Sequence, residues 1–207
     1  MKNIYLFIAI LFASITTFAQ EGVNFRKLTF TEALAQAKQE NKLVFMDCYT
    51  SWCGPCKNMT EKVFPQKAAG DYFNPRFVCV KYDMEKGEGV ELAKQFDVHA
   101  YPSFIIIRPD GTVQHKLVGG DNLENFIARV EKGLNEKTSL LYMNQVYQQG
   151  NMSNLELMEY KNALSEADND KEAARVYQEL LNRLTEQEKT QKEYWSLYTD
   201  GSCTIGS

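Results

Sequence analysis

The stretch Trp52-Cys53-Gly54-Pro55-Cys56-Lys57 decides the fold, because it sets two cysteines three residues apart where the local sequence pattern changes. Before it, the apolar run 43–46 has the length and composition of a strand buried on both faces. After it, residues 56–63 have helical composition, and Pro65 interrupts the pattern. The first cysteine is therefore expected at the junction of a buried strand and the start of a helix.

A cysteine in that place has a defined chemistry. The unpaired amides and the dipole at a helix start favour an anion, so the pKa of the Cys53 thiol is expected below its free value of about 8.5. Because the thiolate is the nucleophile in disulfide exchange, Cys53 is the candidate nucleophile. Cys56, one turn further on and expected to be more buried, is the candidate resolving thiol. Pro55 suits the first turn, where its missing N–H is not needed, and Trp52 is expected to shield one side of the pair.

Asp47 is the candidate acid–base group. It lies six residues before Cys53, at the inner end of the apolar strand. A carboxyl group there is desolvated, so its pKa is expected to rise towards neutral pH, where it can exchange a proton. The alternative is an ordinary, solvated acid at a strand end.

The rest of the first 135 residues alternates between helices and strands, which predicts an α/β fold with a partly parallel central sheet. Thr29 and Glu32 form a capping-box pattern before a helix over 31–40, and Pro109-Asp110-Gly111 is typical of a hairpin turn. Gly133 is expected to end the last of these helices. The further strands are expected at 77–82, 104–107 and 112–117, and the further helices at 91–96 and 123–133.

After about Asn135 the pattern becomes helical only. Two more capping-box patterns, Ser153 with Glu156 and Thr185 with Glu188, fit roughly four helices between residues 138 and 198. The sequence therefore predicts a small all-α extension.

From about residue 25 to 133, the chain resembles the thioredoxin family. The string around the cysteines reads as in thioredoxin itself, and Asp47 and Tyr101-Pro102 lie where the family has a buried acid and a cis-proline. Residues 57–64 and 77–83 are more similar to exported domains of the thiol:disulfide interchange type. The resemblance implies a thioredoxin-like fold, in which a central mixed sheet has helices on both faces.

The resemblance also implies an activity, that of a thiol-disulfide oxidoreductase of the protein-disulfide reductase type that needs no cofactor. Cys53 and Cys56 would form the redox-active disulfide, with Cys53 attacking and Cys56 resolving. Asp47 would move a proton to and from Cys56, and Pro102 would orient the substrate chain by backbone hydrogen bonds. The residues expected to support this site are Trp52, Gly54, Pro55 and Tyr101.

Other roles for the cysteine pair are less well supported. A structural zinc site needs four ligands, yet the sequence has no second C-x-x-C, and His99 and His115 show no ligand spacing. A purely structural disulfide across so short a loop would add little stability. Of the remaining cysteines, Cys48 and Cys79 are expected to be buried apolar residues, whereas Cys203 lies in the tail.

The N-terminus predicts export. Residues 1–19 combine Lys2, an apolar stretch and small residues at a cleavage position, as a secretory signal peptide does. We therefore expect a thioredoxin-like domain over 20–135, a helical extension over 136–199 and a flexible tail over 200–207, in a periplasmic or secreted protein without a membrane span.

Expected partners are cysteine-containing protein substrates and a membrane electron donor of the disulfide-interchange type. A net charge of −4 argues against nucleic-acid binding. The alternative function is a partner-binding or chaperone-like module that uses the thioredoxin fold as a scaffold and the helices as a recognition surface.

Overall fold

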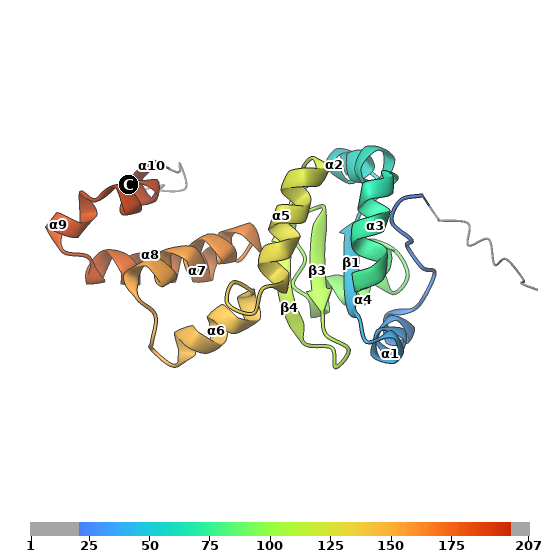
Figure 1. Cartoon of the computed structure of the whole chain (residues 1–207), viewed down its shortest axis with the longest axis horizontal. Helices are drawn as coiled ribbons and strands as arrows, with labels where there is room; N and C mark the ends of the chain where they lie inside the picture. The colour runs from blue at the N-terminus through green and yellow to red at the C-terminus, as the bar shows by residue number, and fades with distance from the viewer. Residues whose placement is uncertain (1–20, 200–207) are drawn as a thin grey trace, which may run out of the picture.

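A four-stranded sheet forms the centre of the protein in a computed structural model that describes residues 21–199 (Figure 1). The strands lie in the order β2-β1-β3-β4. The first two strands pair in parallel and the other neighbours pair antiparallel, so the sheet is mixed, as expected. The strands are β1 (Leu43–Tyr49), β2 (Phe77–Asp83), β3 (Ser103–Ile107) and β4 (Val113–Val118).

Helices cover both faces of the sheet, so β1 is buried on both sides. Alternate residues such as Met46 and Cys48 pack against α1 (Phe30–Glu40) and α4 (Gly89–Gln95). Phe45 points the other way, into a cluster with Phe73, Phe104 and Phe126. That second face is covered by α2 (Gly54–Asn58), the π-helix η1 (Met59–Val63), α3 (Lys67–Arg76) and α5 (Leu123–Leu134).

Local signals in the sequence account for many of the element ends. Thr29 and Glu32 form the predicted capping box at the start of α1. The helical stretch after the cysteines ends at Val63, two residues before Pro65. Gly111 has a φ of 86° in the turn between β3 and β4, a conformation that glycine adopts without steric cost.

Two details differ from the sequence-based expectation. Residues 67–76 form α3, whereas no helix was expected there; Pro75 lies in its last turn, and Pro65 closely precedes it. Gly133 does not end α5, which runs to Leu134 and is capped by Asn135. Gly133 is required for packing instead, because a Cβ there would lie 2.7 Å from the ring of His115.

The helical extension continues beyond the β4 edge of the sheet (Figure 1). It has a core of its own, which includes Leu157, Val176 and Leu180, and α7 packs along α8. The capping boxes at Ser153 and Thr185 are both present. The elements are α6 (Leu140–Gln148), α7 (Asn154–Glu166), α8 (Asp170–Arg183), α9 (Glu186–Lys189), η2 (Lys192–Tyr194) and α10 (Ser196–Thr199).

Some expectations fall outside this description. The predicted signal peptide, Cys203 and the tail over 200–207 lie beyond residues 21–199, and the domain boundary at residue 135 stays a prediction. Within the described range, no helix combines the length and apolar character needed to cross a bilayer.

Candidate active site

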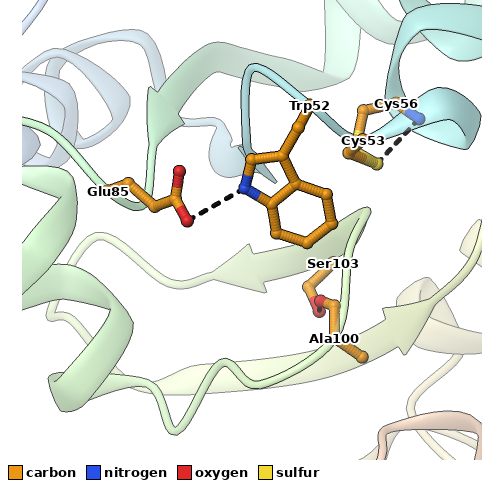
Figure 2. Close-up of a disulfide and its surroundings, with 6 residues drawn as sticks. All are labelled: Trp52, Cys53, Cys56, Glu85, Ala100 and Ser103. Carbon is orange, nitrogen blue, oxygen red and sulfur yellow. Dashed lines mark hydrogen bonds between the residues drawn. A yellow bond between two sulfur atoms is a disulfide. The ribbon is translucent and has the colours of Figure 1, made fainter.

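The cysteine pair lies at the junction of strand and helix that the sequence predicts. Cys53 is the N-cap of α2, and Pro55 occupies the first turn. The two cysteines form a disulfide with their Cα atoms 5.3 Å apart. The backbone N–H of Cys56 donates to Sγ of Cys53 over 3.0 Å, so an amide of the first turn points at that sulfur (Figure 2).

Both cysteines are nearly inaccessible. Cys53 is 2% exposed and Cys56 5% exposed, so the expectation that Cys56 is the more buried of the two is wrong. Gly54 and Pro55, between the two cysteines, are exposed. Access to the pair therefore depends on the loops around it.

Asp47 is buried in the middle of the sheet, as its position in the sequence predicts. It is 2% exposed, and its Oδ1 atom has no hydrogen-bond partner within the described structure. Burial raises the pKa of Asp47 to about 7, although the positive charge of Lys81 acts in the opposite direction. A carboxyl group in this state exchanges a proton near neutral pH.

Lys81 was not predicted as a site residue. It lies directly across from Asp47 in the parallel pair of β1 and β2, on the same face of the sheet. Together with Cys56 it lines a cavity of about 200 Å³. The sequence does carry a signal for it, because Lys81 is the one cation of β2 and directly follows the apolar run 77–80.

Trp52 and Tyr101 form an aromatic wall beside the disulfide. Their rings meet edge to face, with centroids 5.9 Å apart. The indole Nε1 donates to Glu85 over 2.9 Å, and Figure 2 shows the indole between this carboxylate and the disulfide. Trp52 is nonetheless 65% exposed, so the wall offers a large apolar surface to a partner. Glu85 was not predicted from the sequence, because it lies 33 residues from Trp52.

The Tyr101-Pro102 peptide bond is cis. Pro102 has no N–H to donate, and its carbonyl oxygen already accepts from the N–H of Gly119 over 2.8 Å. The role of Pro102 in orienting a substrate chain stays a prediction, and its carbonyl oxygen, which has a second lone pair, is the backbone group through which it would act. Among residues 21–199, the backbone N–H and carbonyl oxygen of Tyr101 make no hydrogen bond, so both are available to a substrate chain.

The remaining cysteines and histidines lie apart from this site. Cys48 and Cys79 are free and buried, as expected, and burial raises the pKa of both thiols. His99 is exposed and His115 is a buried residue of β4. No cluster of three metal-binding side chains occurs in the part of the chain that the structure describes.

Comparisons with known proteins agree with this geometry. The family model described as Thioredoxin matches residues 22–132. Thioredoxin H-type from Oryza sativa subsp. indica is 35% identical over 116 residues, which are 54% of this chain and 89% of that protein. Thioredoxin H4 from Arabidopsis thaliana is 37% identical over 103 residues, 50% of this chain and 81% of that one.

Among solved structures, a proposed disulphide-isomerase from Bacteroides thetaiotaomicron is 48% identical. It covers 56% of this chain and 95% of its own, with a TM-score of 0.52. The fold and the paired cysteines define a thiol-disulfide oxidoreductase. The chain belongs to the thioredoxin family, and the matched segment ends before α6.

Proposed function

We propose that this protein is an exported reductase of protein disulfides that works through a mixed disulfide. The observation that carries the proposal is the combination of Cys53 at the start of α2 with the buried Asp47 on β1. The Gly-Pro spacer resembles the reducing members of the family, which supports reduction over oxidation. Export is supported by the N-terminal sequence alone.

In the first step, the Cys53 thiolate attacks one sulfur of the substrate disulfide. A bond forms between Cys53 and that sulfur, the substrate S–S bond breaks, and the leaving thiolate takes up a proton. The amide that points at Sγ of Cys53, together with the N-terminal end of α2, stabilises the thiolate before attack.

In the second step, Cys56 attacks Sγ of Cys53 and releases the second substrate thiol, so two electrons pass from the dithiol to the substrate. Cys56 must first lose its proton, and Asp47 is the acceptor we assign. Its pKa of about 7 suits this transfer. The cavity lined by Lys81 and Cys56 offers a route by which the proton can then reach solvent.

The substrate chain is held next to Cys53 by the backbone of Tyr101. Its N–H and carbonyl oxygen have no hydrogen-bond partner within residues 21–199, whereas the Pro102 carbonyl oxygen already accepts from Gly119. An extended segment can pair with these groups as with the end of a strand. Trp52 and Tyr101 would supply the apolar contact beside it.

Repeated turnover outside the cytosol needs a source of electrons. We propose a membrane electron donor of the disulfide-interchange type, which would reduce the Cys53–Cys56 disulfide by the same exchange chemistry.

The experiment is reduction of insulin by the full chain without its first 19 residues, with dithiothreitol as electron source, combined with the equilibrium potential of the pair in a glutathione series. Cys53→Ser is expected to abolish reduction, and Cys48→Ser is the matched control that retains it. A potential above about −150 mV would contradict a reductase and indicate an oxidant.

A second candidate function is non-covalent partner binding, which the separate core of the helical extension favours. If the protein is a binding module, the Cys53→Ser variant should still bind its cellular partner and should show no cellular phenotype. Trapping with Cys56→Ser distinguishes a reductase from a binding module. A reductase lacking Cys56 stays joined to its substrate by a mixed disulfide through Cys53, and the joined pair can be recovered.

A further inference from the structure

The helical extension is connected to the active site by a continuous set of polar contacts. It begins at Glu166, the last residue of α7, whose Oε1 pairs with Nε of Arg129 on α5. Both side chains are about four-fifths buried, at 21% and 19% exposure. A charged pair this sheltered is screened less by solvent than a surface pair.

Arg129 uses the rest of its guanidinium group on the backbone after β4. Its Nη1 donates to the carbonyl oxygen of Gly119 over 3.0 Å, and its Nη2 donates to that of Val118 over 2.6 Å. All three nitrogens of this fork are therefore engaged, one with α7 and two with consecutive carbonyls. A planar fork bound at three points fixes a backbone segment in orientation as well as in position.

The same segment holds the loop that faces the cysteines. The N–H of Gly119 donates to the carbonyl oxygen of Pro102, directly after the cis bond. The next residue, Gly120, lies so close to α2 and η1 that a Cβ on it would come within 2.9 Å of the Met59 side chain. Residues 118–120 are thus packed between the Tyr101-Pro102 loop and the helix that carries the cysteines.

We propose that Glu166 and Arg129 are positioning residues through which the helical extension sets the geometry of the substrate-binding loop. The order of contacts is Glu166 to Arg129, Arg129 to the carbonyls of residues 118 and 119, and Gly119 to Pro102. Neither side chain touches the substrate or the sulfurs. This inference rests on the proposed function, in which Tyr101 receives the substrate chain.

Through Glu166, the helical extension contributes to the substrate-binding loop a contact that the thioredoxin segment alone lacks. Glu166 lies 34 residues beyond the end of the matched segment at residue 132. Without its carboxylate, Arg129 keeps its two carbonyl partners but loses the charge that orients its Nε edge. The Tyr101-Pro102 loop then samples more conformations. A smaller fraction of the protein has Tyr101 in the geometry that pairs with an extended substrate, so the substrate binds more weakly.

The first test is kinetic and uses the full chain with dithiothreitol as electron source. Insulin is the protein disulfide, and 5,5′-dithiobis(2-nitrobenzoic acid) is a small disulfide with no chain to pair along Tyr101. Glu166→Gln keeps the shape of the side chain and is expected to raise KM for insulin by roughly three- to tenfold, the effect of losing one sheltered ion pair. Its rate with the small disulfide and the potential of the cysteine pair are expected to stay unchanged.

Glu159→Gln is the matched control, because Glu159 lies on the same helix, is exposed and has no ion pair within the described residues. It is expected to behave as the unsubstituted protein. Arg129→Lys retains the charge but not the fork, so it should raise KM for insulin too, and adding Glu166→Gln to it should change little further. Equal KM values for Glu166→Gln and Glu159→Gln would overturn the proposal.

The second test does not depend on activity. In the oxidised protein, the backbone amide NMR signals of Gly119 and Tyr101 are expected to move in Glu166→Gln and to stay in place in Glu159→Gln. Unmoved signals in Glu166→Gln would overturn the positioning role. If insulin is not reduced by the unsubstituted chain, the proposed function fails, and these amide signals still decide whether the extension positions the loop.

Discussion

At the scale of single residues, Asp47 is a buried carboxyl group that lowers the stability of the fold and can serve as the proton acceptor of the proposed reaction. Its burial in β1 favours the neutral carboxyl, and Oδ1 lacks a partner within residues 21–199. The folded protein therefore holds a proton that the unfolded chain releases at lower pH. A residue that stabilised the fold more at this position would no longer exchange a proton near neutral pH. The loss of stability is therefore a consequence of the property that the proposed role requires.

We predict that Asp47→Asn stabilises the oxidised protein at pH 8 and slows insulin reduction. The pKa of Asp47 is raised to about 7 in the folded state, so the stability of the unsubstituted protein falls as pH rises from about 4 to 7. Asparagine does not titrate, so the variant should be more stable than the unsubstituted protein at pH 8 by roughly 4 kcal/mol. Urea unfolding of both proteins at pH 5 and pH 8 measures this difference in the free energy of unfolding.

Asp83→Asn is the control of opposite sign. The hydrogen bond and charge of Lys86 lower the pKa of Asp83, so its substitution should cost stability at pH 8. A gain for Asp47→Asn that is equally large at pH 5 would contradict the titration account and indicate a packing effect instead.

At the scale of elements, α5 shows how a small residue can be required by a neighbour. Gly133 lies in its last turn, and the ring of His115 occupies the space where a Cβ would be. The ring is held in place because its Nδ1 accepts from the N–H of Leu140 over 3.2 Å. Glycine lowers the helix propensity of α5 at this position, but it leaves room for the His115 ring of β4.

We predict that Gly133→Ala lowers the free energy of unfolding by about 1–3 kcal/mol, since the overlap with the His115 ring outweighs the gain in helix propensity. Thermal unfolding followed by circular dichroism measures the change. Gly54→Ala is the comparison, because a Cβ there meets nothing within 4 Å. An unchanged or higher melting temperature for Gly133→Ala would show that the ring moves aside freely.

How much of these elements could be predicted depends on whether the signal is local. Capping boxes, the apolar β1 and the turn at Gly111 are local, and the structure has each of them. α3 is missed because Pro65 precedes it, Pro75 lies in its last turn and the stretch has little apolar periodicity. The buried Ala69 and Phe73 hold it to the sheet. The pair of Arg129 and Glu166 joins residues 37 apart, so no spacing rule points to it.

At the scale of the whole molecule, the sheet and the helical extension meet around His115. This residue of β4 is 1% exposed and accepts from the first amide of α6, a group that a helix start otherwise leaves unpaired. The contact orients α6 against the sheet edge. The thioredoxin segment and the extension are thus connected by a buried residue whose charge depends on pH.

We predict that acid weakens the protein through this contact. Burial lowers the pKa of His115 to about 4; Lys132 and Arg129 act in the same direction, and Glu166 acts against them. The contribution of neutral His115 is fully present above the unfolded pKa of about 6.5 and is lost as pH falls towards 4, up to about 3 kcal/mol. Chemical unfolding at pH 7, 5.5 and 4.5 measures this loss.

His115→Gln cannot take up the proton, so it should be less stable than the unsubstituted protein at pH 7 but should lose less stability between pH 6.5 and 4. His99→Gln is the matched control, since His99 is exposed and its ring hydrogen-bonds to the nearby Asp97. This variant should retain the full acid dependence. If both variants keep the same slope between pH 6.5 and 4, the acid sensitivity arises elsewhere in the molecule and His115 does not make the junction pH-dependent.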